Sequence, residues 1–378
     1  MRILYVTNVR FPTEKAHGWQ IAKMCDAFAS LGHEVTLVVP DRETPIKEDA
    51  RSYYQLKQKF EIVKLPIWDA LATPWIPRLA AFLIGEWSFK RAVRRWLKTV
   101  PSGLALVMTR DQFLAPGLRR PDWKVAFEAH DISPRFFWLH RRLAKCCDLL
   151  IASNEWKKNE IIKRWRISIK GKVLALQNGI DLGPYVEMPE KGAARDALGW
   201  DVAEKVVLYT GHLYDWKGVY VLADASPHLP PGHRIVMLGG TPEDAKRMRD
   251  YLAEKEFDNV TLLPHVAHKD VLTYLAAADC LVLPNSAKSW NSVYTTSPIK
   301  LWEYLAARRP LVASDLPSLR ESVNDQEVRF VEPDQPEKLA QALAEECRGD
   351  VSRVEAGWNR AKRQTWTARA EAIVQAAL

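Results

Sequence analysis

The stretch "TTSPIKLWEYLA", residues 295–306, holds the residue types of an anion-binding site. It lies between two apolar runs and begins a helical pattern. Ser297 before Pro298 is a good N-cap followed by a good first helical residue. The N–H groups of a first helical turn lack intrahelical partners, so they can face an anion, and Lys300 adds a positive charge. Glu303 could accept hydrogen bonds from ribose hydroxyls beside a diphosphate, or it could simply complement the helix dipole.

The stretch "VVLYTGHLYDWKG", residues 206–218, ends an apolar run at Gly211 and begins a helix after Lys217. A lysine at this position can reach a phosphate as a point charge, and His212 lies close to it in the sequence. The alternative is an ordinary turn between a strand and a helix, with the lysine in solvent.

The stretch "FEAHDIS", residues 127–133, places His130 and Asp131 just after an apolar run. His130 could donate a hydrogen bond to a sugar hydroxyl or share charge with Asp131. A loop histidine that is satisfied by its own surroundings is the equal alternative.

Glycines and histidines mark three further turns. Gly18 precedes a helical pattern and could let a ligand approach backbone N–H groups, although a plain turn explains it as well. Gly240 in "MLGGTPED" precedes good N-capping sequence, so this loop either starts a helix or lines a nucleotide-base pocket. His265 and His268 are expected in a loop. Neither these histidines nor the five cysteines show metal-ligand spacing, so no metal site is predicted.

The elements that must position these residues are short, almost wholly apolar runs separated by helical patterns. Such runs indicate parallel strands that are covered on both faces, with the helices as crossovers. The runs are residues 2–7, 35–39, 60–65, 104–109, 124–129, 148–153 and 173–177, and then 206–210, 234–239, 260–263, 280–283, 311–314 and 328–331. The predicted fold class is α/β, with two doubly wound Rossmann-like domains facing a cleft. Ligands bind beyond the carboxyl ends of strands in such folds, where the polar stretches lie.

The bulk composition is that of a globular protein with two domains. The 378 residues carry a net charge of +8, and residues 1–185 hold 31 Lys and Arg against 18 Asp and Glu. This basic half could face an anionic membrane surface or a phosphorylated ligand. Nucleic acid is not expected as a partner, because no recognised binding module is present. With no signal peptide and no spanning segment predicted, we expect a cytoplasmic protein, peripheral on the inner face of the membrane if it binds lipid at all.

One segment, residues 68–100, is aromatic, apolar and basic. Its tryptophans Trp75, Trp87 and Trp96 alternate with Lys and Arg. It could lie on an anionic membrane surface, or it could be a crossover helix with its apolar stripe in the core. The pattern slightly favours the core for the tryptophans and the membrane for the basic residues.

With these residues assembled, the chain resembles a GT-B glycosyltransferase of group 1, the retaining family 4. The stretches that carry the resemblance are "GHLYDWKG", "LAAADCLVLPNS", "QNGID" and above all "TTSPIKLWEYLAARRPLVASDLPSLRE". The N-terminal half matches more loosely. The resemblance implies an acceptor domain over residues 1–182, a donor domain over 183–360, and a last helix, 361–378, that crosses back to the first domain.

The resemblance also implies a role for each candidate residue. The donor would be a nucleotide diphosphate sugar, and the acceptor a hydroxyl of a glycan or a lipid-linked molecule, with no metal or other cofactor. His130, Lys217 and Glu303 would act at the reacting sugar, the diphosphate and the ribose. The remaining donor contacts would come from Gly18, Gly211, His212, Gly240, His265, Val266, Thr295, Ser297, Pro298, Ile299, Lys300 and Leu301.

Two departures from the family pattern keep other functions open. Thr295 stands where many relatives have a glutamate near the donor sugar, and His212 stands where an arginine is common. These departures leave a non-catalytic nucleotide-sugar-binding protein of the same fold as an alternative. A GT-B-fold nucleotide-sugar epimerase is a second alternative. The favoured interpretation is a retaining hexosyltransferase that serves cell-surface polysaccharide or glycolipid synthesis.

Overall fold

A computed structural model describes residues 1–70, 73, 75–130, 137–165 and 172–378. The chain forms two compact units, residues 1–178 with 366–378 (unit 1) and residues 179–365 (unit 2). The divisions predicted from the sequence, after residues 182 and 360, stand a few residues from these transitions. No helix within the described residues is long and apolar enough to cross a membrane.

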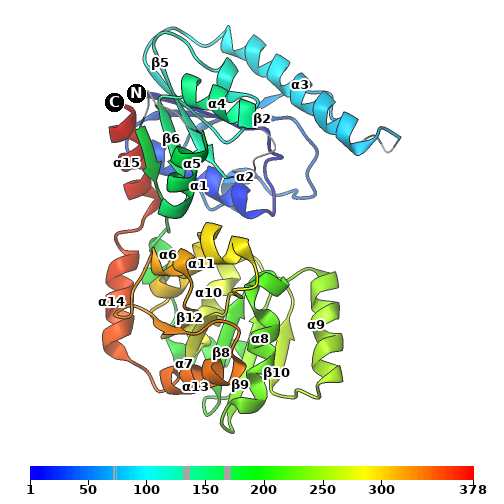
Figure 1. The fold of residues 1–378 in the computed structure, drawn as a ribbon, viewed down its shortest axis with the longest axis vertical. Helices are drawn as coiled ribbons and strands as arrows, with labels where there is room; N and C mark the ends of the chain where they lie inside the picture. Colours follow the sequence, from blue (N-terminus) through cyan, green and yellow to red (C-terminus); the bar gives the residue numbers. More distant parts are fainter. Residues whose placement is uncertain (71–72, 74, 131–136, 166–171) are drawn as a thin grey trace. The chain divides into compact units, whose positions relative to one another are not determined.

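Unit 1 is built on a parallel seven-stranded sheet in the order β3-β2-β1-β4-β5-β6-β7 (Figure 1). Its strands are β1 (Arg2–Val6), β2 (Glu34–Pro40), β3 (Glu61–Leu65), β4 (Ala105–Thr109), β5 (Trp123–Ala129), β6 (Leu149–Ala152) and β7 (Lys172–Ala175). Its helical elements are α1 (Ala16–Ser30), α2 (Ala50–Tyr53), α3 (Arg78–Leu97), η2 (Ala115–Gly117), α4 (Phe137–Cys146), α5 (Glu155–Trp165) and α15 (Trp366–Ala377).

Successive residues of β1 show why its apolar run is continuous. Ile3 and Tyr5 pack against α1 and α15 on one face of the sheet, while Leu4 and Val6 pack against α3, α4 and α5 on the other. Side chains alternate across a strand, so a strand covered on both faces must be apolar throughout. The last helix therefore completes one face of the first sheet, as predicted.

Unit 2 has a parallel six-stranded sheet in the order β10-β9-β8-β11-β12-β13 (Figure 1). Its strands are β8 (Lys205–Thr210), β9 (His233–Leu238), β10 (Val260–Leu263), β11 (Cys280–Leu283), β12 (Leu311–Ser314) and β13 (Arg329–Val331). Its helical elements are α6 (Gly183–Val186), α7 (Lys191–Leu198), η4 (Asp215–Lys217), α8 (Val219–Asp224), η5 (Ser226–His228), α9 (Pro242–Glu254), α10 (His268–Ala277), the π turn η6 (Asn291–Thr295), α11 (Ile299–Ala306), α12 (Pro317–Arg320), α13 (Pro336–Glu346) and α14 (Val351–Ala361).

All thirteen predicted strands form, most within one residue of the expected bounds. The α/β class and the two doubly wound sheets are confirmed. In each unit the polar stretches follow the strands β5, β8, β9 and β11, at the carboxyl edge where a parallel sheet binds ligands.

Candidate functional site

Lys300 lies against Gly211 at the carboxyl edge of the unit 2 sheet. Gly211 follows β8 with a φ of 119°, and a Cβ atom there would overlap the end of the Lys300 side chain. The Lys300 Nζ atom is 4.4 Å from the centre of the Tyr209 ring and donates to the Tyr209 hydroxyl at 3.3 Å. Burial, and then the charge of Lys217, hold the pKa of Lys300 well below its usual range. The sequence pointed to Gly211 and Lys300 separately, but no local pattern indicated that they lie in contact.

Lys217 ends the 3₁₀ turn η4 beside the same strand edge. Its Nζ atom is 3.9 Å from the centre of the Trp216 ring, and burial lowers its pKa to about 8. Gly218 follows with a φ of 73°, where any side chain would overlap the carbonyl of Pro284 after β11. The tight approach of these two loops therefore requires glycine at 218 and fixes the position of Lys217.

The two lysines have no close carboxylate partner among the described residues, since no ion pair joins either ammonium group to a carboxylate there. The charge of Lys217 lowers the pKa of Lys300, and the more distant carboxylate of Glu303 raises it. His212 is exposed and experiences the charges of both lysines, and its ring stacks on that of Tyr214 with the ring centres 4.9 Å apart. Desolvation and the charge of Lys300 lower the pKa of His212, so its imidazole is mainly neutral at pH 7. An anion that binds here would meet two ammonium groups that have no carboxylate within ion-pair distance in the described part of the chain.

Helix α11 begins one residue later than predicted. Pro298, not Ser297, is the N-cap, and no side chain caps the helix. The predicted N-cap role of Ser297 is therefore wrong, because the chain is still extended at Pro298, with ψ at 126°. The Leu301 N–H already donates to the Pro298 carbonyl at 3.2 Å, which leaves Ile299 and Lys300 as the first-turn residues that can offer N–H groups to a ligand.

The threonine hydroxyls before α11 stabilise the turn in which they lie. The hydroxyls of Thr295 and Thr296 donate to the Asn291 carbonyl at 3.1 and 2.9 Å, closing the π turn η6. This bonding accounts for Thr295 without a donor sugar. Its predicted contact with the donor stays a prediction.

Glu303 is paired with a residue to which the sequence assigned no role. The His268 Nε2 atom lies 2.9 Å from Glu303 Oε1, and only 14% of the Glu303 side chain is exposed. His268 is the first residue of α10, so its predicted place in a loop is wrong. The two residues are 35 positions apart, and nothing in their spacing indicates the contact.

The remaining unit 2 candidates surround the same strand edge. Gly240 follows β9 with a φ of 83° and leaves room for Leu213. Thr241 and Asp244 form a capping box at the start of α9, which confirms the capping interpretation of this loop. His265 is exposed, and Val266 is half-buried against the unit 2 core. Roles for Gly240, His265 and Val266 beside a base remain predictions.

Gly18 lies inside the first turn of α1 rather than before the helix. A Cβ atom there would overlap the Tyr54 hydroxyl and the methyl group of Thr13. The Tyr54 hydroxyl accepts from the Thr13 N–H at 2.7 Å and donates to the Thr13 carbonyl at 2.9 Å. Packing therefore explains this glycine, and the ligand contact predicted for it has no support of its own.

His130 follows β5 as predicted, and its partner is Glu128, two residues earlier. The His130 Nε2 atom lies 3.2 Å from Glu128 Oε1. Glu128 is buried in the sheet, where Arg110 and Arg369 also bind it. Asp131, the predicted partner of His130, lies outside the described residues. A carboxylate within an otherwise apolar strand was the signal that could have identified Glu128.

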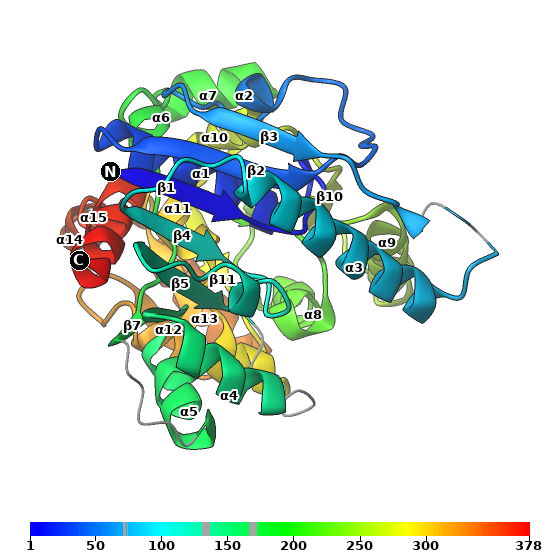
Figure 2. The ribbon, with the colours of Figure 1, turned by 90° about the horizontal axis from the view of Figure 1, so that it is seen from above.

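Helix α3 buries one face and exposes an unusual second one. Ala81, Gly85, Phe89, Val93 and Leu97, four residues apart, pack into the unit 1 core. Trp75 and Trp87 are 81% and 60% exposed, so their predicted place in the core is wrong. Trp96 is half-buried against the core, as expected. In both views α3 runs out beyond the sheet of its unit (Figures 1 and 2).

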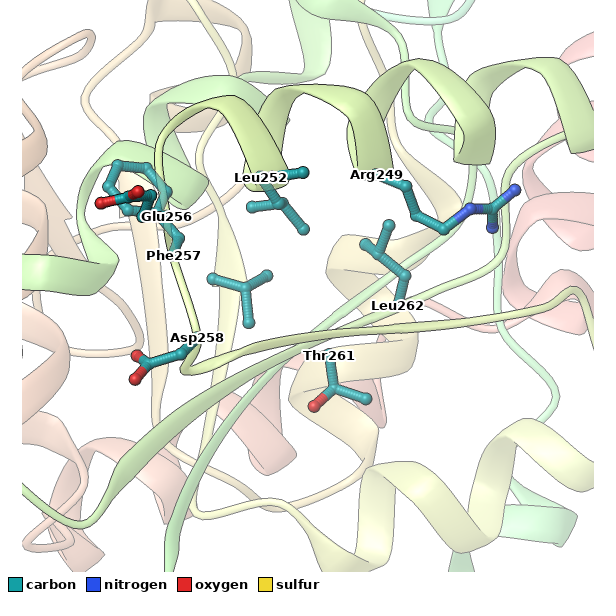
Figure 3. A pocket seen from close by; sticks show the side chains of 9 residues that line it. Arg249, Leu252, Glu256, Phe257, Asp258, Thr261 and Leu262 are labelled. Atoms are coloured by element: carbon teal, nitrogen blue, oxygen red, sulfur yellow. The ribbon is translucent and has the colours of Figure 1, made fainter.

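A surface hollow of about 540 Å³ lies between α9 and the edge strand β10. Figure 3 shows Leu252 and Leu262 lining it, with the Arg249 guanidinium pointing away from Leu252. None of the predicted site residues lines this hollow. Its charged groups do not converge, so it does not compete with the lysine pair as a ligand site.

Comparison with known proteins places this chain and its fold in a class. The family model described as "Glycosyl transferases group 1" matches residues 204–347, and that described as "Glycosyltransferase Family 4" matches residues 18–183. The architecture is that of the GT-B glycosyltransferases. The chain belongs to the group 1 and family 4 glycosyltransferases of this fold.

A named protein is similar to part of this chain, and solved structures share its fold. The D-inositol 3-phosphate glycosyltransferase of Mycobacterium tuberculosis is 31% identical over 154 residues, which cover 39% of this chain and 30% of that protein. The chain thus matches about a third of the length of its curated relatives. Sucrose-phosphate synthase of Thermosynechococcus elongatus is 18% identical with a TM-score of 0.75, covering 99% of this chain and 98% of that one. Anabaena HepE in complex with UDP-glucose is 17% identical with a TM-score of 0.71, covering 99% and 98%.

Proposed function

We propose that this protein transfers a sugar, with retention of configuration, from a nucleotide diphosphate sugar to a hydroxyl of a glycan or a lipid-linked acceptor. The observation that carries the proposal is the pair Lys217 and Lys300 at the first turn of α11, two lysines with no carboxylate within ion-pair distance among the described residues. A leaving nucleotide diphosphate gains negative charge as the sugar gains oxocarbenium character. Cations and N–H groups held in place before the reaction stabilise that charge.

The donor binds unit 2 in this proposal. Lys217, Lys300 and the N–H groups of Ile299 and Lys300 hold the diphosphate. Glu303 accepts from the ribose hydroxyls, for which His268 must give up or share its contact with the carboxylate. His130 of unit 1 acts at the transferred sugar. With charge supplied by lysines, transfer needs no divalent metal, and activity should survive excess EDTA.

Retention is proposed to follow same-face attack, with none of the described candidate residues assigned as a nucleophile. The departing diphosphate then accepts the proton of the attacking acceptor hydroxyl. The bond from the sugar to the diphosphate oxygen breaks, the bond to the acceptor oxygen forms on the same face, and the nucleotide diphosphate leaves. Exclusion of water from the site would prevent hydrolysis of the donor.

The first experiment identifies the donor. Thermal unfolding is followed with UDP, GDP and ADP and with their sugars, UDP first because UDP and UDP-glucose are bound in structures of HepE. A ligand at 100 times its dissociation constant stabilises by about 2.7 kcal/mol. No shift with any nucleotide would contradict the proposal.

The second experiment tests transfer. Nucleotide diphosphate should be released only when an acceptor is present, and Lys217→Ala and Glu303→Ala should each abolish the release. Lys246→Ala, at an exposed lysine of α9, is the control. Donor binding without turnover over a broad acceptor panel would favour the non-catalytic alternative, which Thr295 and His212 motivate. Conversion of the donor without acceptor would favour an epimerase.

The acceptor side of the proposal places unit 1 on an anionic membrane surface, as expected for synthesis of a cell-surface polysaccharide or glycolipid on the inner face of the membrane. Leu79 and Leu83 are 73% and 56% exposed on α3, next to Trp75 and Trp87. The same helix continues into Arg91, Arg94 and Arg95. Exposed aromatic and aliphatic side chains beside basic ones suit the interface of an anionic bilayer.

Co-sedimentation with phosphatidylcholine vesicles, with and without phosphatidylglycerol, tests this surface. Binding is expected only to the anionic vesicles, and the double variant Trp75→Ser, Trp87→Ser should lose it. Val351→Ser in unit 2, at a residue 79% exposed, is the control of equal exposure. Equal binding of the double variant and the parent chain would rule out this face.

A further inference from the structure

The Glu128 carboxylate contacts side chains from four parts of unit 1. Its Oε1 atom lies 3.1 Å from Arg110 Nη2, 2.8 Å from Arg369 Nη2 and 3.2 Å from His130 Nε2. Its Oε2 atom accepts from Arg110 Nε at 3.1 Å and from the Tyr5 hydroxyl at 3.4 Å. Glu128 and Arg369 are each only 2% exposed at the side chain. The carboxylate is therefore held from β1, the end of β4 and the last helix.

The ionisation of Glu128 decides what His130 can do. Burial alone would raise the pKa of this carboxyl, but Arg110 and Arg369 hold it well below its usual range. An ionised carboxylate only accepts hydrogen bonds, so the His130 Nε2 atom must carry the proton in their contact. When the ring is neutral, its other nitrogen, Nδ1, is then an acceptor.

The His130 ring is mainly neutral at pH 7. Among the described residues, the charged groups that face it are Arg110 after β4, Lys157 of α5 and Glu128, and His17 of α1 is also near. Desolvation and the charge of Arg110 lower the pKa of His130, while Glu128 opposes them. His17 is itself neutral, because burial and the charge of Arg110 lower its pKa to about 4.

We propose that Glu128 is a positioning residue that fixes His130 with Nε2–H toward the Glu128 carboxylate and Nδ1 as the acceptor nitrogen of the ring. Arg110 and Arg369 in turn fix Glu128. The expectation that His130 donates to a sugar hydroxyl is thereby reversed, since the neutral ring accepts a hydrogen bond from that hydroxyl. The role at the sugar rests on the proposed function, whereas the tautomer and its cause do not.

The test of the tautomer needs no enzymatic activity, and a variant is used only to assign the signal. The side-chain nitrogen shifts of ¹⁵N-histidine-labelled full chain are measured near pH 7.5, with His130→Gln to assign the signal. A single Nε2–H tautomer with an Nε2 proton that persists against exchange is expected for His130. The exposed His212 serves as the internal reference. An Nδ1–H tautomer at His130 would overturn the inference.

The role of Glu128 is tested with Glu128→Gln, and Tyr5→Phe is the matched control. Tyr5→Phe removes a contact to the other carboxylate oxygen and should leave the His130 signal unchanged. Glu128→Gln removes the charge that favours the imidazolium, so the His130 titration midpoint should fall by about one unit or more. An unchanged midpoint in a folded Glu128→Gln chain would overturn the positioning role.

Kinetics separate this inference from the proposed function. Glu128→Gln should lower kcat at least about tenfold, because a small misplacement of a reacting group is costly, with the Kd for the donor unchanged. An equal loss of donor affinity would indicate a general structural role instead. If the parent chain transfers no sugar, the proposed function fails while the tautomer result stands.

Discussion

Each unit has a pair of basic residues near the carboxyl edge of its sheet, Arg110 and Arg369 in unit 1 and Lys217 and Lys300 in unit 2, and the two pairs differ in their partners. Arg110 and Arg369 share the carboxylate of Glu128 and make bonds of 2.8 to 3.1 Å to it. In unit 2 the ammonium groups of Lys217 and Lys300 rest on the rings of Trp216 and Tyr209. The arginine cluster is complete without a ligand, whereas the lysine pair is not.

This difference predicts that the arginine cluster contributes to stability, whereas the lysine pair contributes to ligand binding. A buried cation that has lost its partner is costly, so the arginine cluster should contribute to the folded state only as a whole. The lysine pair carries a desolvation cost and mutual repulsion that an anion would relieve. The comparison predicts opposite results when a cation is removed from one unit or from the other.

The largest effect is expected in unit 1 from Arg369→Ala. The variant removes contacts to Glu128, to the Gln177 carbonyl and to the Met24 sulfur atom, and it should cost about 3–5 kcal/mol of unfolding free energy. Chemical denaturation measures the loss. Arg164→Ala, which breaks an exposed pair with Glu160 in the same unit, should cost less than about 1 kcal/mol. Similar losses in both variants would remove the basis for the comparison.

The next effect is expected in unit 2 from Lys300→Met. Methionine keeps the apolar stem and removes a buried charge, so the melting temperature should stay constant or rise. Donor affinity or kcat should fall about 100-fold, the cost of removing one group that stabilises the leaving charge. Calorimetry with the donor and a melting curve measure both. A destabilised variant with normal donor binding would assign Lys300 a structural role.

A smaller effect is expected from Gly218→Ala. The added Cβ atom would overlap the Pro284 carbonyl, and the φ of 73° disfavours alanine, so we expect a loss of at least about 2 kcal/mol. Gly192→Ala is the control, because this glycine of α7 has open space around its Cβ position and should be neutral or slightly stabilising. If both variants unfold alike, the contact between the loops after β8 and β11 does not position Lys217.

The smallest effect is a dependence on pH. Lys217 has a pKa of about 8 instead of 10.5, so it loses its charge as pH rises through 8. The kcat/KM for the donor should therefore fall above pH 8, whereas Lys217→Arg should move the fall to higher pH. The free energy of unfolding should rise over the same range, because between pH 8 and 10.5 the unfolded chain binds the Lys217 proton more strongly than the folded chain does. A flat pH profile would contradict the role of Lys217.

The sheet architecture could be predicted from the sequence because its signal is local. Each apolar run is bounded by turn residues, and a parallel sheet covered by helices on both sides requires apolar residues on both faces of its strands. The start of α11 was misplaced by one residue for a related reason. Ser297 and Pro298 satisfy the rules for a helix start, but the π turn before them holds the chain extended through Pro298.

The contacts of the site could be predicted only in part. Lys217 and Lys300 could be named because each lies in a stretch that follows a strand. Their proximity could not be predicted, because the two lysines are 83 residues apart in the sequence. Arg369 reaches Glu128 across 241 residues, and no local pattern links them. At Gly18 the sequence left a ligand contact and a plain turn open, and packing against Tyr54 accounts for the glycine, while the ligand contact stays a prediction.

Helix α15 also bears on how the chain is made. Residues 1–178 leave the ribosome first, but the unit 1 core includes Trp366, Ala370 and Ile373, and Glu128 waits for Arg369. Unit 2 is continuous and can complete its core while the chain is still growing. The half that is synthesised first is thus the last to be finished, and during translation the part of its core that α15 covers must remain open beside α1 until all of unit 2 has emerged.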